Sequence, residues 1–253
     1  MKIDVSVIII THNRADLLSS AIDSVLAQSF KDFELFIIDD DSSDNTEFIV
    51  RPYLSDDRVK YFKIHKQKSI AAVRNFAWPY VNGKYIAVLD SDDIWIDCDK
   101  LQKQYDYLEK NVEVVVLGGA AIKINEEGAE LNRVLKPLTD EDIKKELFVK
   151  NPFFHSSVMF RLNAVTPPFV YEDKISFGED WDLWLRLGEK NKLANLPDYL
   201  VSYRVHSDNE ASKHSLKAVF DVFWVISKHR RLYGKSRMIY VEKIFRKLLE
   251  HLR

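Results

Sequence analysis

Residues 5–14 read Val-Ser-Val-Ile-Ile-Ile-Thr-His-Asn-Arg, a short β-branched apolar run followed by four polar residues. An apolar run of this length is typical of a strand that is buried on both faces of a sheet. The apolar residues between Leu17 and Leu26 then recur at helical spacing, and Asn13 is suited to cap that helix. The stretch therefore predicts a buried strand, a polar loop and a helix.

The same unit recurs along the first part of the chain. Further strands are predicted at Phe33–Ile38, Val59–Ile64 and Tyr85–Leu89, and helices from near Asp44, over 69–80 and over 100–110. The alternation predicts an α/β fold with a mixed, mostly parallel sheet flanked by helices. Beyond it, the pattern is less regular and predicts strands at 114–124, 156–161 and 200–206, and a helix at 181–190.

Three polar clusters follow predicted strands: Thr11 to Arg14, Asp39 to Asp44, and Asp90 to Asp93. Ligands of such sheets bind beyond the carboxyl ends of the strands, so we expect these clusters to share one edge and form a site. Asp90 and Asp92 lie two apart and point to one side of an extended chain. Clustered carboxylates suit Mg²⁺ or Mn²⁺, although a solvated turn that caps the next helix has the same pattern.

Glu179 and Asp180 stand before Trp181 at the start of a predicted helix. One of these acids can act as a general base, but acids also stabilise helix N-termini electrostatically, so the pattern alone favours the structural role. Trp181 is more often a core residue than a platform for a sugar. His206, after the last predicted strand, can bind metal or phosphate or simply be structural.

Composition excludes several classes of protein. The 253 residues include 46% hydrophobic residues, too many for a disordered chain. A net charge of −2 argues against a strongly basic nucleic-acid binder, and no GxGxxG or P-loop motif is present. Cys98 is the only cysteine, and no apolar run is long enough to span a membrane. We therefore expect a protein of a reducing compartment, the cytoplasm.

The small net charge conceals a split. Residues 211–253 hold 11 Lys and Arg against 3 Asp and Glu, whereas residues 1–210 hold 26 against 36. Apolar residues at helical spacing predict two amphipathic helices in this basic tail, separated near Gly234. The tail either packs on the main domain or docks on an anionic membrane surface, at the inner face of the plasma membrane.

Together and in this order, the motifs resemble those of an inverting family-two glycosyltransferase with the GT-A fold. The matching stretches are 7–14, 37–44, 72–75 (Ala-Val-Arg-Asn), 85–95, 178–186 (Gly-Glu-Asp-Trp-Asp-Leu-Trp-Leu-Arg) and 203–206 (Tyr-Arg-Val-His). The resemblance covers residues 3 to about 210. It implies a glycosyltransferase domain at 1–210, with a nucleotide-binding half at 1–110 and an acceptor-binding half at 111–210, followed by the tail.

The resemblance also implies a role for each site residue. The nucleotide would be bound by Thr11, Asn13, Arg14, Asp39, Asp40, Arg74, Asp90 and Ser91. Asp92 and His206 would hold the Mn²⁺ or Mg²⁺ that neutralises the donor diphosphate, and Asp180 would be the catalytic base. Glu179, Trp181 and His155 would lie on the acceptor side.

The implied reaction moves one sugar from a nucleotide-sugar, most simply a UDP-sugar, to a glycan or lipid-linked saccharide. The QxxRW signature of processive family members is absent, which favours a single transfer. Two alternatives remain at this point. Leu89-Asp90-Ser91-Asp92 also fits a phosphohydrolase with an Asp nucleophile, and the acids also fit a non-catalytic protein that binds sugar nucleotides.

Overall fold

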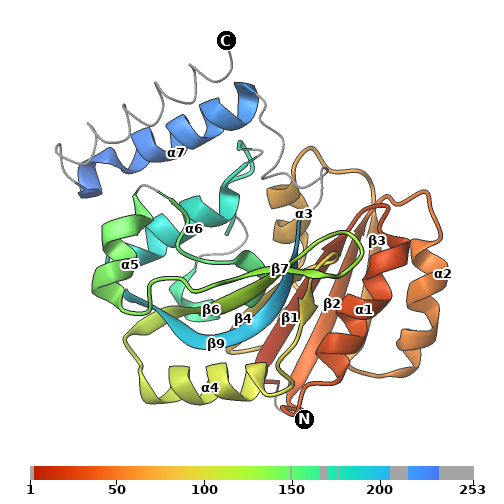
Figure 1. Cartoon of the computed structure of the whole chain (residues 1–253). Helices are drawn as coiled ribbons and strands as arrows, with labels where there is room; N and C mark the ends of the chain where they lie inside the picture. Colours follow the sequence, from red (N-terminus) through yellow and green to blue (C-terminus); the bar gives the residue numbers. More distant parts are fainter. Residues whose placement is uncertain (1–2, 149, 166–169, 176, 206–215, 234–253) are drawn as a thin grey trace.

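The polar loops that end strands β1 (Val5–Thr11), β2 (Phe33–Asp40) and β4 (Tyr85–Asp90) emerge at one edge of a nine-stranded sheet (Figure 1). The computed structural model describes residues 3–148, 150–165, 170–175, 177–205 and 216–233. β1 pairs in parallel with both β2 and β4, and β2 pairs in parallel with β3 (Val59–Ile64). The predicted parallel arrangement is confirmed for these four strands.

The second half of the chain continues the sheet in a mixed manner. Its strands are β5 (Ile94–Trp95), β6 (Val114–Ile124), β7 (Glu130–Val134), β8 (Met159–Arg161) and β9 (Lys192–Arg204). The order across the sheet is β3-β2-β1-β4-β8-β6-β9-β5, with β7 on β6. β8 runs antiparallel to β4 and β6, whereas β6 and β9 are parallel. The predicted mixed, mostly parallel sheet is therefore present.

Helices cover both faces of the sheet. They are α1 (Ala15–Leu26), α2 (Thr46–Val50), α3 (Ile70–Phe76), α4 (Lys100–Lys110), α5 (Asp140–Leu147), α6 (Glu179–Gly188) and α7 (Leu216–Tyr233). Alternate residues of β1 enter two separate cores, because successive side chains of a strand point to opposite faces. Ile8 packs with residues of α3, α5, α6 and α7, whereas Val7 and Ile9 pack with residues of α1, α2 and α4.

Several details differ from the sequence prediction. α1 begins after Arg14, and Asn13 does not cap it but adopts a left-handed backbone conformation with φ of 51°. α3 ends at Phe76, before the predicted boundary, because Pro79 cannot donate a helical hydrogen bond. β5, β7 and α5 were not predicted, and β9 begins eight residues earlier than expected, at Lys192.

The first predicted helix of the basic tail is α7, which packs against α6. Val225 and Ile226 enter the same core as the sheet, while Phe220, Phe223 and Trp224 are exposed. The second predicted tail helix lies outside the described residues. Among the helices that the structure describes, none has both the length and the hydropathy that crossing a bilayer requires.

Candidate active site

The register of the parallel strands brings the three polar clusters together. Thr11 stands beside Asp39 on the neighbouring strand, and Ile10 stands beside Asp90. Because the three strands are adjacent and parallel, their following loops share one edge of the sheet (Figure 1). The predicted convergence of the clusters is thus a property of the sheet.

Asp39 is completely buried at this edge. Its Oδ1 accepts a hydrogen bond from the Ser42 backbone N–H at 2.8 Å, and its Oδ2 accepts one from the Tyr61 hydroxyl at 2.6 Å. Neighbouring Thr11 is also buried, and its Oγ1 has no hydrogen-bond partner among the described residues. Asp40 accepts from the Gln67 N–H at 2.6 Å and forms an ion pair with Lys66 at 2.7 Å.

Asn13 joins the first two loops. Its Oδ1 accepts from the backbone N–H of Ser43 at 2.8 Å, and its own N–H donates to Ser42 Oγ at 2.9 Å. Asp44 reaches back in the other direction, accepting from the Ala15 N–H at 3.0 Å in the first turn of α1. Asn13 therefore fixes the loop that carries Arg14, which is half-buried beside it.

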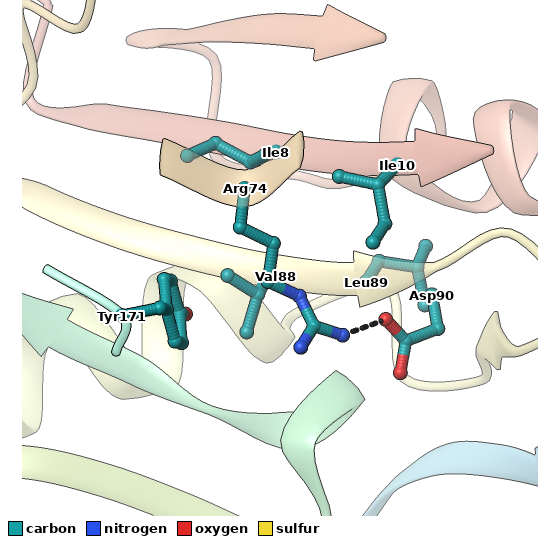
Figure 2. A pocket seen from close by; sticks show the side chains of 7 residues that line it. All are labelled: Ile8, Ile10, Arg74, Val88, Leu89, Asp90 and Tyr171. Carbon is teal, nitrogen blue, oxygen red and sulfur yellow. Dashed lines mark hydrogen bonds and ion pairs between the residues drawn. The ribbon is translucent and has the colours of Figure 1, made fainter. Parts of the chain in front are cut away.

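Arg74 connects three elements at the centre of the site. From α3, its Nη2 donates to Asp90 Oδ1 at the end of β4 at 2.7 Å, and its Nη1 donates to Glu179 Oε1 at the start of α6. The guanidinium also lies over the Tyr171 ring, 5.5 Å from the centroid. As Figure 2 shows, Arg74, Asp90 and Tyr171 line a small pocket whose other walls are apolar.

Burial and charge set the ionisation of this triad. Burial alone would lower the pKa of Arg74, but the charges of Asp90 and then Glu179 raise it above its ordinary value. Burial would raise the pKa of Asp90, yet the charge of Arg74 holds it below its ordinary value. For Glu179, burial outweighs the attraction of Arg74 and raises the pKa to about 7. One cation thus serves two carboxylates.

The cluster after β4 is crowded with acids. Asp93 is buried, and its carboxylate accepts from Ser156 Oγ at 2.5 Å and from the Arg204 backbone N–H at 2.8 Å. Burial, and after it the charges of Asp92 and Asp90, raises the pKa of Asp93 well above its ordinary value. Ser91 is buried and Asp92 half-buried. Repulsion of this kind is what a bound cation relieves.

The second predicted metal ligand, His206, lies outside the described residues. Within the described part of the chain, one group of three potential metal ligands has its ligand atoms close enough together to hold an ion. The group consists of Asp97, Cys98 and Asp99. This group stands at the start of α4, and Asp97 is paired with Lys103 at 2.6 Å. It is separate from the Asp90–Asp93 cluster, and we assign it no role.

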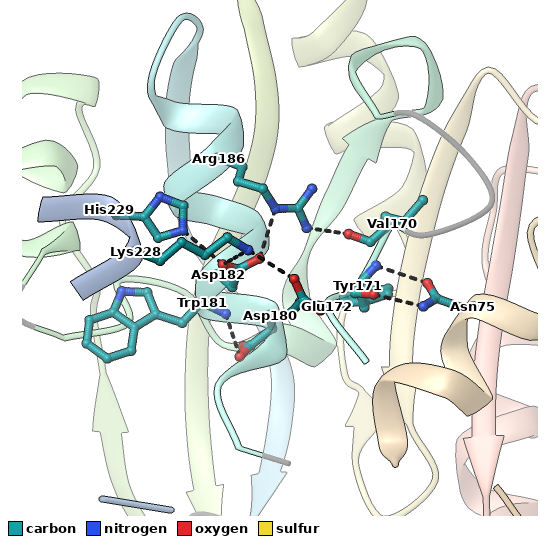
Figure 3. A network of polar contacts seen from close by, with 10 residues as sticks. All are labelled: Asn75, Val170, Tyr171, Glu172, Asp180, Trp181, Asp182, Arg186, Lys228 and His229. Carbon is teal, nitrogen blue, oxygen red and sulfur yellow. Dashed lines mark hydrogen bonds and ion pairs between the residues drawn. The ribbon is translucent and has the colours of Figure 1, made fainter. Parts of the chain in front are cut away.

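Asp180 lies in the first turn of α6, where it is half-buried. Its Oδ2 accepts from the Asn151 side-chain amide at 2.6 Å. Its Oδ1 accepts from the Trp181 N–H at 2.7 Å (Figure 3). Gly178 precedes the helix with φ of 84°, a conformation that favours glycine. The carboxylate is therefore oriented by contacts on both oxygens.

The predicted acceptor-side residues differ in exposure. Glu179 is buried against Arg74, as described above. Trp181 is also buried, and its Nε1 donates to the Leu147 carbonyl at 2.6 Å, a placement typical of a core residue. His155 is buried, with Nε2 3.2 Å from the Tyr171 hydroxyl. Burial, followed by the charge of Arg74, lowers the pKa of His155 to about 4, so its imidazole is neutral at pH 7.

Four residues that hold the site together carried no individual role in the sequence analysis. They are Asn151, Ser156, Tyr171 and Arg204. Each contacts a predicted site residue that lies far from it in the sequence. A local sequence motif does not reveal such a contact. The backbone of Tyr171 is itself fixed by the Asn75 side chain through two hydrogen bonds of 2.8 and 2.9 Å (Figure 3).

A buried ion cluster attaches α7 to α6, close to Asp180. Asp182 is fully buried and contacts Arg186 at 2.9 Å, Lys228 at 3.0 Å and His229 at 2.8 Å (Figure 3). Burial would raise the pKa of Asp182, but the His229 hydrogen bond and the cations hold it well below its ordinary value. Lys228 also pairs with Glu172 at 3.2 Å.

Comparison with known sequences identifies the family of the chain. Residues 6–166 match the family model described as glycosyl transferase family 2. The chain is 34% identical to the Escherichia coli protein named UDP-Glc:alpha-D-GlcNAc-diphosphoundecaprenol beta-1,3-glucosyltransferase WfgD, over 86% of this chain and 84% of that protein. It is 33% identical to an uncharacterised glycosyltransferase of Rickettsia conorii over 79% of this chain, but spans only 33% of that protein.

The fold of this chain is similar to those of solved structures. Staphylococcus aureus TarS (residues 1–349), in complex with UDP-GlcNAc, superimposes with a TM-score of 0.74 at 18% identity, over 90% of this chain and 66% of that one. The mannosyltransferase PcManGT of Pyrobaculum calidifontis, in complex with GDP-Man and Mn²⁺, gives 0.69 at 16% identity, over 93% and 66%. The chain therefore has a GT-A-like fold, as predicted.

Proposed function

The chain belongs to glycosyl transferase family 2, and on this premise we propose that it transfers a single sugar from a nucleotide-sugar to a saccharide hydroxyl with inversion. The observation that carries the proposal is the convergence of Asp90, Glu179 and Asp180 around Arg74 at the carboxyl edge of the sheet, with Asp92 in the loop that follows Asp90. Acids after β4 face the donor diphosphate, while Asp180, on α6, faces the acceptor.

The donor that we propose is a UDP-sugar. Buried Asp39 and Thr11, at adjacent strand ends, offer a carboxylate and an unpaired hydroxyl to a nucleobase. The name of the WfgD relative includes UDP-Glc as its donor, and TarS is described in complex with UDP-GlcNAc. GDP is the competing nucleotide, because PcManGT is described with GDP-Man.

The acids after β4 fit a divalent cation. Asp92 is the residue that we propose as the protein ligand, because it lies in the loop after β4 between Asp90, which pairs with Arg74, and Asp93, which contacts Ser156 and Arg204. Burial raises the pKa of Asp93 most, and the charges of Asp92 and Asp90, which a cation would balance, raise it further. When bound, Mn²⁺ or Mg²⁺ would supply neutralisation of the diphosphate leaving group. His206 remains a proposed second ligand.

Asp180 is the proposed base. Asn151 and the Trp181 N–H orient its carboxylate, which in the proposal accepts the proton of the attacking hydroxyl as the new glycosidic bond forms. The carbon–oxygen bond to the diphosphate breaks on the opposite side of the anomeric carbon, so the configuration inverts. The ion pairs of Arg74 with Asp90 and with Glu179 connect the end of β4 to the start of α6, where Asp180 lies.

The acceptor that we propose is a lipid-linked saccharide, in line with the diphosphoundecaprenol named for WfgD. Exposed Phe220, Phe223 and Trp224 on α7, together with the excess of Lys and Arg in residues 211–253, support contact of the basic tail with an anionic membrane surface. Pelleting with anionic and neutral vesicles at low salt tests this contact, and equal recovery with both vesicles would refute it.

Thermal-shift screening of nucleotide-sugars with and without Mn²⁺ tests the donor proposal, since binding to the native state raises Tm. We expect UDP-sugars with Mn²⁺ to give the largest shift, and the best donor is then used in a transfer assay. The phosphohydrolase alternative has little support, because Asp90, its would-be nucleophile, is paired with Arg74. Donor binding without transfer to any saccharide would favour the non-catalytic alternative.

A further inference from the structure

Lys136 lies close to the proposed base but takes no part in the mechanism above. It belongs to the loop between β7 and α5 and is half-buried. Its Nζ donates to the Asn151 carbonyl at 3.0 Å, and the Asn151 amide donates to Asp180 Oδ2 at 2.6 Å. One residue therefore separates this ammonium group from the carboxylate at which the acceptor hydroxyl would react.

Two aromatic rings extend this surface towards a second lysine. Lys136 Nζ lies 4.6 Å from the centroid of the Phe154 ring, which lies 5.5 Å from the ring of Tyr203. Tyr203 on β9 stands beside Lys123 on β6, and residues that are side by side on neighbouring strands point to the same face. We call Lys123, Lys136, Phe154 and Tyr203 the basic wall.

The basic wall carries two lysine side chains. Within the described part of the chain, neither Lys123 nor Lys136 forms an ion pair, whereas nearby Lys150 is paired with Glu146 at 2.9 Å. Burial, and then the charges of Lys150 and Lys123, lowers the pKa of Lys136, and the charges of Glu146 and Asp180 oppose this only in part. A half-buried cation beside like charges is unfavourable unless an anion compensates it.

We propose that the basic wall binds a phosphate or diphosphate group of the acceptor. The inference rests on the proposed function, because it places an accepting hydroxyl at Asp180. Lys136 reaches Asp180 through Asn151, so an anion bound at Lys136 lies on the side of the proposed base. Tyr203, at the other end of the wall, lies near Asp92 and Asp93, so the donor diphosphate is the competing occupant that the experiment must distinguish. A saccharide linked through diphosphate to a lipid has this arrangement of groups.

Binding of a lipid diphosphate, measured without catalysis, tests the proposal. The protein is first saturated with Mn²⁺ and the nucleoside diphosphate that the donor screen selects, and is then titrated calorimetrically with farnesyl diphosphate or with farnesol. Because a hydrogen bond to a charged group is lost, Lys136→Met should weaken farnesyl diphosphate binding roughly tenfold or more and leave farnesol binding unchanged. Lys136→Arg should retain most of the affinity.

Lys145→Met is the matched control, since Lys145 is an exposed lysine that is already paired with Glu141 and Asp142. Equal affinity of wild type and Lys136→Met for farnesyl diphosphate would overturn the proposal, as would an equal loss for farnesol. A loss of nucleotide affinity instead would assign Lys136 to the donor. Competition by inorganic pyrophosphate against farnesyl diphosphate in the wild-type protein is expected and does not depend on the folding of a variant.

Failure of the proposed function is distinguishable from failure of this inference. The proposed function fails if no nucleoside diphosphate binds in the donor screen or if no sugar is transferred. Transfer kinetics then add a second readout. Lys136→Met should raise KM for a diphosphate-linked acceptor without changing KM for an alkyl glycoside of the same sugar. An equal change for both acceptors would indicate a purely structural role and overturn the proposal.

Discussion

Replacing Arg74 with Met should destabilise the protein strongly, because it leaves two carboxylates without their shared cation. Glu179 is the costlier of the two, since its side chain is 10% exposed, whereas that of Asp90 is 30% exposed. Removing one partner of a buried ion pair typically costs about 3–5 kcal/mol. For a chain of this size, that corresponds to a fall in Tm of roughly 6–20 °C.

The penalty should also depend on pH. Burial raises the pKa of Glu179 from 4.5 to about 7 in the native state, so its contribution to stability is present below pH 4.5 and is lost as pH rises towards 7. Without Arg74, the pKa of Glu179 rises further, and the loss extends to higher pH. The difference in Tm between wild type and Arg74→Met should therefore be larger at pH 8 than at pH 5.5.

Thermal unfolding of three variants at both pH values measures these effects. In the double variant Arg74→Met/Glu179→Gln, the buried charge is absent, so part of the lost stability should return, with a coupling of roughly 1–3 kcal/mol. Lys68→Met is the control, because Lys68 forms an exposed pair with Asp173 and should contribute at most about 1 kcal/mol. A penalty that does not change with pH, or no recovery in the double variant, would refute this account of Arg74.

The remaining predictions concern the base, the metal and α7. Asp180→Asn should lower kcat roughly 10²–10⁴-fold and leave the nucleotide-induced rise in Tm unchanged. Asn151→Ala, which removes only the group that orients Asp180, should lower kcat roughly tenfold. A wild-type kcat in Asp180→Asn would show that Asp180 is not the base. Asp92→Asn should abolish the additional rise in Tm that Mn²⁺ gives in the presence of nucleotide, and keep the rise that nucleotide gives alone. An unchanged additional rise with Mn²⁺ would show that the metal binds elsewhere. Asp182→Asn should cost roughly 1–3 kcal/mol at pH 7 and less at pH 3, because the lowered pKa of Asp182 contributes stability that is lost on acidification. Equal costs at both pH values in denaturant melts would contradict that assignment, and His229→Gln should show the same trend with a smaller cost.

The sequence predicted the parallel half of the sheet well because each strand there is a buried apolar run between polar loops. β3 and α4 have the predicted bounds, and the three polar clusters share one edge of the sheet as expected. Adjacent parallel strands end at the same edge of a sheet, so the carboxylates that follow β2 and β4 could be predicted to lie together from the order of the strands in the sequence. Asn13 is the exception, since its amide found partners in the loop after β2 instead of in the next helix.

The second half was less predictable because its elements are defined by pairing and not by composition. β7 is largely exposed and polar, so it carries no apolar pattern, and β5 has only two residues. The contacts of Asn151 with Asp180 and of Ser156 with Asp93 join segments 29 and 63 residues apart. No spacing rule relates such positions, so these residues were recognisable only from the structure.

The Arg74 triad has a consequence for how the protein acquires its function during synthesis. Arg74 and Asp90 are 16 residues apart and can pair as soon as the first half of the chain has left the ribosome, whereas Glu179 is 105 residues from Arg74. The early pair is neutral, and the later arrival of Glu179 and Asp180 makes carboxylates exceed cations. A nascent chain that has folded only its first half would thus contain the acids after β4 but lack Asp180, the proposed base, so donor binding would precede the capacity for transfer.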